Sequence, residues 1–486
     1  MKKKSVALNS LIYAFKSVLG IIFPMITFPY VSNILGPTNI GKVEYANSIT
    51  NYFIFLAALG IATYAIREGA KVKDDFEELS KLSTELIIIN GVSSVIAYIG
   101  VLIICNISFF SEYALLIFIN SFTILFTTVG MEWVYNIKED FAYITLRYIV
   151  MQIISLVFLF VFVKSREDYY YYAIYIVMAT VGSNIINVFC LRKHINIFKK
   201  RKLNIKRHIK PVLLLFSISI AVNIFSNLDT TMLGIMKTET EVGIYQTGLK
   251  IDKIVTNVIA AISLVVFSRS SYLLKDGDLS ENSEFKKLIK QFNSLIIMVA
   301  APLTVGLMAI SVNLTKVFLS EEFVMSAYVL MIISWNVLLS AVGRIYGHQI
   351  LVGTGNDRKY FLSTVMAILI DVILNLILIP YLGAIATAIS TVAACLISNI
   401  YVIWCASKLT RVKEMIFSMS KYVAFSLPFL GISFLINYFD LMEWLKLILI
   451  IIICVVYYIA VLLLTKDKYI KQLFIMLFKK RRNKNV

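Results

Sequence analysis

The sequence has little charge and few of the residues from which soluble catalytic sites are built. Asp, Glu, Lys and Arg make up 16% of its 486 residues, whereas about 25% is usual in a soluble protein. It contains only three histidines and five cysteines, and no two cysteines have the C-x-x-C spacing of a zinc or redox site. The low charge excludes a soluble enzyme, a nucleic-acid-binding factor and a disordered chain. The scattered histidines and cysteines indicate neither a metal centre nor a disulfide framework.

Apolar residues are correspondingly abundant, at 59% of the chain, and the mean hydropathy is +0.82. A transmembrane helix needs about 20 mostly apolar residues, so this composition predicts an all-α polytopic membrane protein with about 14 transmembrane helices. The first apolar segment is interpreted as a span rather than a signal peptide. The predicted spans are residues 8–32, 43–65, 83–105, 113–135, 142–163, 169–190, 211–235, 243–267, 291–313, 324–352, 360–379, 383–405, 421–438 and 444–465.

Positive charge dominates the polar residues, with 47 Lys and Arg against 29 Asp and Glu and a net charge of +18. Most of the cations fall in alternate loops, the pattern by which basic residues mark the cytoplasmic side of a membrane. We therefore expect a multi-pass protein of a bacterial plasma (inner) membrane with both termini in the cytoplasm. The densest basic segment, residues 192–210, is interpreted as an orientation signal, with contact to anionic lipid headgroups as the alternative.

A repeated motif divides the chain into two halves. A Leu-Gly pair followed by Gly41 and Tyr45 recurs as a Leu-Gly pair followed by Gly243 and Tyr245. Recurrence in the same orientation predicts two six-helix bundles related by a pseudo-twofold axis along the membrane normal, as in transporters. The expected domains are an N-terminal bundle at 1–205, a C-terminal bundle at 206–408, and two appended transmembrane helices with a basic cytoplasmic tail at 409–486.

Polar residues inside the predicted spans are the main candidates for function, because polar groups are expensive in a bilayer. They recur at helical spacing on one face of several spans and suggest a central cavity for an anionic, hydroxyl-rich molecule. The alternative is that amides and hydroxyls bridge neighbouring helices and that charges form structural ion pairs. The candidate cavity residues are Lys16, Asn47, Asn51, Asn223, Gln246, Lys250, Lys253, Asn257 and Arg344.

Three acids within the spans, Asp229, Asp252 and Asp371, are candidates for binding a coupling proton or Na⁺. Arg147 lies close to the end of a predicted span, so we expect its long side chain to reach the lipid headgroups. The sequence has no nucleotide-binding P-loop and no constellation of catalytic residues. We expect a transporter without a cofactor or metal, not an enzyme.

Several motifs resemble the polysaccharide flippases of the O-antigen and capsule type (Wzx-like). These flippases share a superfamily with the multidrug and toxin extruders and the lipid II flippases. The matching segments include Phe28–Gly36, Gly41–Ala46, Leu59–Ile61, Arg67-Glu68, Asn227–Asp229, Val242–Tyr245, Asn375–Pro380 and Gly383–Thr387.

The resemblance implies a V-shaped pair of six-helix bundles that works by alternating access. The cargo would be a polyprenyl-diphosphate-linked oligosaccharide, moved from the cytoplasmic to the outer face of the membrane for O-antigen or capsule synthesis. Its expected partners are this cargo, membrane lipids, a polysaccharide polymerase and a chain-length regulator, with no nucleic acid. The alternatives are a multidrug or organic-cation exporter of the same fold and, in another class, a membrane glycan polymerase or transferase.

Overall fold

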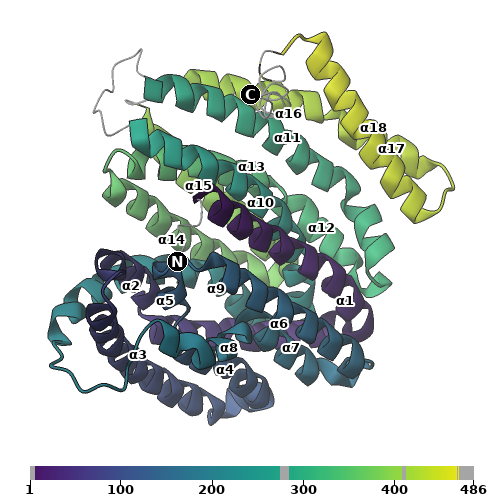
Figure 1. Ribbon diagram of the computed structural model, residues 1–486. Helices are drawn as coiled ribbons and strands as arrows, with labels where there is room; N and C mark the ends of the chain where they lie inside the picture. Colours follow the sequence, from purple (N-terminus) through teal and green to yellow (C-terminus); the bar gives the residue numbers. More distant parts are fainter. Residues whose placement is uncertain (1–5, 274–283, 408–411, 468, 470–486) are drawn as a thin grey trace. The chain divides into compact units, whose positions relative to one another are not determined.

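The computed structural model describes residues 6–273, 284–407, 412–467 and 469, and these residues form helices and connecting segments without strands (Figure 1). The α-helices are α1 (Val6–Ala58), α2 (Ile61–Gly69), α3 (Phe76–Cys105), α4 (Ala114–Gly130), α5 (Glu132–Ile137), α6 (Phe141–Phe162), α7 (Tyr169–Val181), α8 (Ser183–Cys190), α9 (Lys206–Met236), α10 (Glu239–Leu273), α11 (Glu284–Phe318), α12 (Val324–Ile333), α13 (Trp335–Gly343), α14 (Asp357–Leu382), α15 (Ala384–Ala406), α16 (Val412–Ser426), α17 (Pro428–Tyr438) and α18 (Glu443–Leu464). A π-helix, η7 (Arg344–Val352), follows α13. The 3-10 turns are η1 (Ala70–Val72), η2 (Ser108–Tyr113), η3 (Arg166–Asp168), η4 (Leu191–Lys193) and η6 (Glu321–Phe323).

Within the described residues, 10 helical segments are long and apolar enough to cross a membrane, or 11 if the bent pair Arg166–Val181 and Ser183–Lys193 is one span. The predicted fold class, an all-α polytopic membrane protein, is confirmed, but the count of about 14 spans is not. Predicted span one lies in α1, and predicted span two runs from α1 into α2; both overlap the single segment Ile22–Val72. Predicted spans seven and eight coincide with the helices α9 and α10.

A break at Gly36 divides α1 into two arms. Gly36 has φ 71° and ψ 172°, a backbone conformation that is essentially restricted to glycine. Pro37 follows directly, and proline suits the first position of a new helical arm because its ring presets φ and it needs no hydrogen-bond acceptor. An unbroken helix of 53 residues would be about 80 Å long, so this break is what turns the chain between the two predicted spans.

The helices group into two compact units, and the first comprises Met1–Gly243. In unit 1 the arms of α1 pack against α3, α4, α6, α7 and α9, and α9 also contacts α2. Its buried core contains Leu79 and Leu86 of α3, Trp133 and Tyr135 of α5, and Val212 of α9. α9, which the sequence assigns to the second bundle, thus completes the core of unit 1. The predicted boundaries at 205 and 408 themselves stay predictions.

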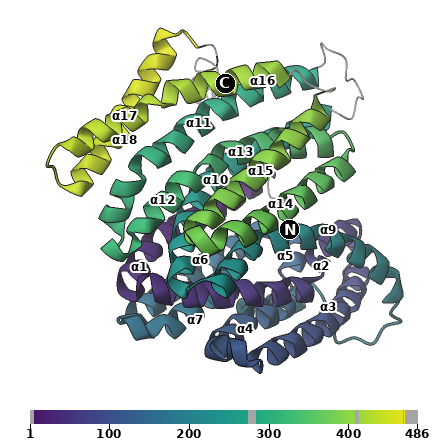
Figure 2. The same cartoon turned by 180° about the vertical axis from the view of Figure 1, so that it is seen from behind.

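Unit 2 comprises Ile244–Val486 and is organised around α11, which contacts α12, α13, α16, α17 and α18. Figures 1 and 2 both show α17 and α18 side by side at the C-terminal end of the chain. The Tyr458 hydroxyl of α18 donates to the Met298 carbonyl of α11 at 2.7 Å, and the Ser433 hydroxyl of α17 donates to the Ala309 carbonyl at 2.6 Å. The C-terminal helices are therefore fastened to the core of unit 2. The predicted basic tail lies outside the described residues.

Candidate functional site

A partly buried ion-pair cluster joins three helices of unit 1. Glu132 begins α5, after Met131 adopts a left-handed conformation (φ 43°, ψ 44°) that turns the chain out of α4. One carboxylate oxygen, Oε2, lies 2.6 Å from Nη2 of Arg147 on α6, and the other, Oε1, lies 3.4 Å from Nζ of Lys16 on α1. The single carboxylate of Glu132 therefore forms ion pairs with two cations within the predicted membrane region.

Arg147 is the buried member of this cluster, and the expectation that it reaches the lipid headgroups is wrong. Its side chain is 2% exposed and donates through Nη1 to the Ser183 carbonyl and to Oδ1 of Asn184, each at 3.1 Å. The guanidinium also lies 5.8 and 5.9 Å from the ring centroids of Tyr135 and Tyr143. The nearby Glu132 carboxylate and these carbonyl, amide and aromatic groups make burial of the cation favourable, which distance from the end of the span could not indicate.

Lys16 is the accessible member, with a side chain that is 23% exposed. Its ammonium lies 5.4 Å from the centroid of the Tyr148 ring on α6. Gly20, one turn further along α1, also lies beside this ring, because a Cβ there would be in ordinary van der Waals contact with the Tyr148 hydroxyl, at 3.6 Å. The predicted polar face of α1 thus lies against α6, with a cation that is held by a carboxylate and an aromatic ring.

The predicted amide stripe of unit 1 forms a ladder between α1 and α9. Asn51 Nδ2 donates to Oδ1 of Asn227 at 3.0 Å, and Asn227 Nδ2 donates to the Asn223 carbonyl at 3.0 Å. One turn away, the hydroxyls of Tyr52 and Thr231 lie 3.0 Å apart. The Asn51 amide therefore connects α1 to α9 through Asn227, which also bonds to the backbone of Asn223. Asn47 is half-buried on the same helix.

The two copies of the repeated glycine motif contact each other within unit 1. A Cβ on Gly41 would lie 1.7 Å from the Glu239 carbonyl oxygen, and a Cβ on Gly243 would lie 1.9 Å from the Pro37 carbonyl oxygen. The hydroxyls of Thr38 and Thr240 lie 2.8 Å apart in the same contact. The turn inside α1 and the turn between α9 and α10 thus touch through their backbones.

Glu239 anchors this contact with its side chain. It accepts a short hydrogen bond from the Tyr113 hydroxyl, and the Tyr113 ring packs edge-on against Tyr45 with centroids 4.9 Å apart. Burial raises the pKa of the Glu239 carboxyl, but the hydrogen bonds from Tyr113 and from its own backbone N–H, together with the charge of Lys42, outweigh burial. The net pKa lies below its ordinary value. Glu239 is thus held as a carboxylate where the two turns meet.

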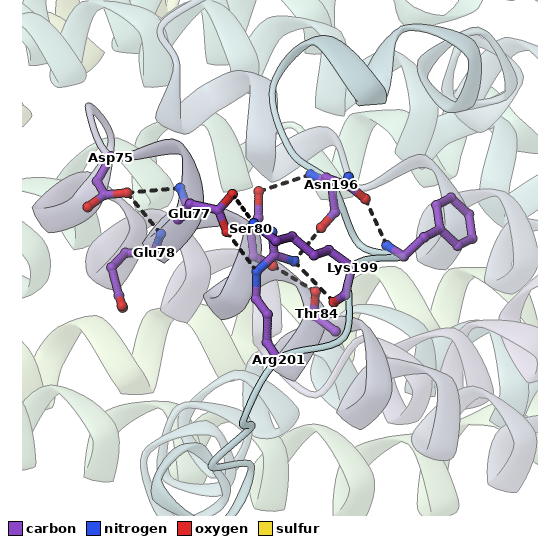
Figure 3. A network of polar contacts seen from close by, with 9 residues as sticks. Asp75, Glu77, Glu78, Ser80, Thr84, Asn196, Lys199 and Arg201 are labelled. Carbon is purple, nitrogen blue, oxygen red and sulfur yellow. Dashed lines mark hydrogen bonds and ion pairs between the residues drawn. The ribbon is translucent and has the colours of Figure 1, made fainter.

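The basic segment before α9 is fastened to the start of α3 (Figure 3). Asp75 caps α3 by accepting from the backbone N–H groups of Glu77 and Glu78 at 2.8 and 3.0 Å. Glu77 then pairs with Lys199 at 2.9 Å and with Arg201 at 3.0 Å. Ser80, Thr84 and Asn196 complete the network drawn in Figure 3, in which the Asn196 N–H donates to the Ser80 hydroxyl at 2.9 Å. Part of the loop's positive charge is therefore neutralised within unit 1.

A second acid of α3, Glu85, is fully buried and binds the same connecting segment. Its Oε1 accepts from the Asn204 N–H, and its Oε2 lies 2.7 Å from both Nη2 of Arg207 and Nε2 of His208. The other ring nitrogen of His208, Nδ1, lies 2.7 Å from the Tyr64 hydroxyl of α2. This cluster joins α2, α3 and the start of α9.

The remaining predicted site residues belong to unit 2. On α10, Lys253 and Asn257 are exposed and one helical turn apart, Lys250 is half-buried and Gln246 is buried. Arg344 is exposed at the first residue of the π-helix η7, a rare helix type that is frequent at functional sites. Gly347 lets η7 approach Tyr360 of α14, because a Cβ there would lie 2.6 Å from the tyrosine ring.

The three predicted coupling acids are all buried. Asp252 of α10 is 0% exposed; its Oδ2 accepts from Nδ2 of Asn336 on α13 at 3.3 Å, and its Oδ1 has no partner among the described residues. Asp371 of α14 is also 0% exposed and lies one turn from the buried Asn375. Asp229 is buried in α9, within unit 1.

Sequence reasoning missed Glu132 and Glu85, the two acids that organise unit 1. Glu132 lies in a predicted span without an oppositely charged neighbour one helical turn away, whereas Glu85 follows Lys81 by one turn but pairs with residues far along the chain. A usable signal was present for Glu85, because carboxylates inside an apolar span require a partner, and the basic segment 192–210 supplies several. For Glu132 no local pattern points to Lys16, which is 116 residues away.

Comparisons with known proteins relate the chain to transporters of surface glycans. A family model described as "Polysaccharide biosynthesis protein" matches residues 6–273. The "Putative O-antigen transporter" of Escherichia coli (strain K12) is 22% identical over 385 residues, which cover 78% of this chain and 91% of that protein. The "Probable low-salt glycan biosynthesis flippase Agl15" of Haloferax volcanii is 24% identical over 167 residues, or 34% of each chain.

Two solved structures share the fold. The lipid II flippase MurJ in an inward closed conformation gives a TM-score of 0.72 at 18% identity, covering 95% of this chain and 99% of that one. An inward-facing multidrug resistance MATE family transporter of the MOP superfamily gives 0.56 at 14% identity, covering 80% and 98%. The predicted helical transporter fold is therefore confirmed.

Proposed function

Since the chain belongs to the polysaccharide biosynthesis protein family, we propose that it is a flippase for polyprenyl-diphosphate-linked oligosaccharide repeat units. It moves them by alternating access from the cytoplasmic to the outer face of the plasma membrane, for O-antigen or capsule synthesis. The observation that carries the proposal is the family match over residues 6–273, together with the O-antigen transporter that aligns with 78% of the chain. These relatives are transporters and flippases, and we propose that this chain likewise moves its cargo without a cofactor or a chemical change.

The chemistry of the predicted site residues suits this cargo. Lysine and arginine bind phosphate oxygens, whereas amides and hydroxyls hydrogen-bond sugar hydroxyls. In the proposed mechanism Lys16, Lys253 and Arg344 receive the diphosphate, and Asn47, Asn51, Asn223, Gln246, Lys250 and Asn257 line the path of the glycan. The exposure of Lys253 and Arg344 and the partial exposure of Lys16 support this assignment. The polyprenyl tail remains in lipid.

We also propose the setting in which this transport occurs. The chain is a multi-pass membrane protein, and its basic loops favour a bacterial inner membrane with both termini in the cytoplasm. A polysaccharide polymerase and a chain-length regulator on the outer side are the partners that would use the flipped repeat units. Bends at Gly20, Pro24 and Pro29 of α1 accompany the switch between inward and outward states.

The first experiment measures which face of the plasma membrane holds the lipid-linked oligosaccharide in cells that lack this gene. We expect accumulation on the cytoplasmic face, relieved by the wild-type chain but not by the Lys253→Ala, Arg344→Ala double variant at equal membrane abundance. Lys287→Ala is a matched control, because it removes an exposed lysine at the start of α11 that is not one of the proposed site residues. Normal outward exposure of the lipid-linked glycan in the deletion cells would reject the flippase proposal.

Asp252 is the coupling acid that we propose to test first. A fully buried carboxyl with one oxygen lacking a partner favours the protonated form or a bound cation over a bare charge. Asp252→Asn preserves the shape and the contact to Asn336, so we expect transport that no longer responds to the proton or Na⁺ gradient. Glycan exposure in cells treated with an ionophore measures this response. An unchanged response in Asp252→Asn would exclude the residue from coupling.

A further inference from the structure

The two ion pairs of Glu132 are unequal, and the difference has a structural cause. The 2.6 Å contact to Arg147 is fixed, because Arg147 is 2% exposed and its guanidinium also donates to Ser183 and Asn184. The 3.4 Å contact to Lys16 is looser, and the side chains of Lys16 and Glu132 are 23% and 34% exposed. The carboxylate is therefore held from one side by a buried cation, while the other cation stands at an accessible surface.

Lysine is suited to exchange between anions at such a surface. Its ammonium is a point charge with three donors on a flexible stem, so it can leave one anion for another without a fixed planar geometry. Tyr148, whose ring centroid lies 5.4 Å from the ammonium, gives the cation a second favourable contact that requires no anion. Lys16 is thus positioned to change partners while Glu132 remains bound to Arg147.

We propose that Glu132 is a resident anion that the cargo's diphosphate must displace from Lys16. This inference rests on the proposed function and deepens it, since it identifies Glu132 as a residue that sets the specificity for the cargo headgroup. In the unloaded protein Glu132 neutralises Lys16. A diphosphate carries more charge than a carboxylate and displaces it, whereas a neutral headgroup cannot. When the headgroup leaves, Glu132 forms its ion pair with Lys16 again and so opposes rebinding of the headgroup.

The test uses the full-length protein in detergent and three soluble probes that differ only in the headgroup: farnesyl diphosphate, farnesyl phosphate and farnesol. Calorimetric titration of the wild type is expected to give the tightest binding for the diphosphate. Glu132→Gln removes the competitor, so farnesyl phosphate should bind about two- to fivefold more tightly and its disadvantage against the diphosphate should shrink. Lys16→Gln should weaken the binding of both farnesyl diphosphate and farnesyl phosphate. The Lys16→Gln, Glu132→Gln double variant should have the same affinities as Lys16→Gln.

Several controls separate this role from a structural one. Glu139→Gln removes an exposed carboxylate that pairs with Lys73 at 3.0 Å, and it should leave all three affinities unchanged. Glu132→Asp keeps a charge for Arg147 but has a shorter reach to Lys16, so it should also strengthen farnesyl phosphate binding if Glu132→Gln does not fold.

Two results would overturn the inference: unchanged phosphate affinity in a folded Glu132 variant, or tighter binding that persists without Lys16. Either result leaves the flippase proposal intact if deletion cells still retain the glycan on the cytoplasmic face. Normal outward exposure in those cells would instead reject the function itself.

Discussion

Gly41→Ala and Gly243→Ala are each expected to prevent the protein from folding. A methyl group at either position would occupy the space of a backbone carbonyl oxygen, at 1.7 Å from that of Glu239 and 1.9 Å from that of Pro37. Backbone cannot rotate aside as a flexible side chain can, so the two turns would have to separate. Separation would also break the contact between Thr38 and Thr240. We expect little or no monodisperse protein after extraction from membranes.

Gly91→Ala and Gly306→Ala are the matched controls for this prediction. Both glycines lie inside long helices, α3 and α11, and a Cβ at either site would meet nothing within 4 Å. Because alanine favours a helix over glycine by about 1 kcal/mol, these variants should be as stable as the wild type or slightly more stable. Size-exclusion profiles and thermal unfolding in detergent make the comparison. Wild-type unfolding temperatures for the Gly41 and Gly243 variants would contradict the close contact of the two turns.

Glu85→Leu is expected to have the second-largest effect, a loss of stability of about 1–3 kcal/mol. The substitution leaves the Asn204 N–H and the side chains of Arg207 and His208 without their buried acceptor. The loss is costly because the His208 ring is 4% exposed and loses its buried acceptor, whereas water can solvate Arg207, whose side chain is 45% exposed. The segment that connects η4 to α9 and binds α3 should then become accessible to protease.

Limited proteolysis at residues 196–204, together with thermal unfolding, measures both parts of this prediction. Glu78→Gln is the control, because Glu78 is an exposed acid of the same helix. Glu85→Gln should lose less stability than Glu85→Leu, since an amide oxygen still accepts hydrogen bonds. If Glu85→Leu resists proteolysis and heat as well as the wild type, the cluster does not hold this segment.

The helices of the fold could be predicted because apolar runs and polar breaks are local properties of the sequence. The repeated motif likewise indicated the turn at Gly36 and the matching turn that precedes Gly243. The number of spans was less accessible, because predicted spans one and two fall in one nearly continuous helical segment, Ile22–Val72. That α9 packs into unit 1 could not be predicted, since packing partners depend on surfaces from distant parts of the chain.

The candidate site shows the same limit at the level of single residues. The stripe that includes Lys16 followed from helical spacing, but its partner Glu132 is brought near by the left-handed turn at Met131. For Arg147 the depth in the span suggested lipid headgroups, whereas a carboxylate 15 residues away in sequence decides its position. Spacing therefore identified polar faces, and only the tertiary structure identifies the charges that these faces contact.

The contact between Gly41 and Glu239 also constrains how the chain is synthesised. Its two sides are about 200 residues apart, so at roughly 5–20 residues per second the first waits about 10–40 s for the second to leave the ribosome. During this interval the turn at Gly36 and Pro37 exists without its partner, and unit 1 lacks α9. The early helices must therefore persist in the bilayer as a partly assembled intermediate. A chain arrested before residue 239 should be a substrate for membrane quality control.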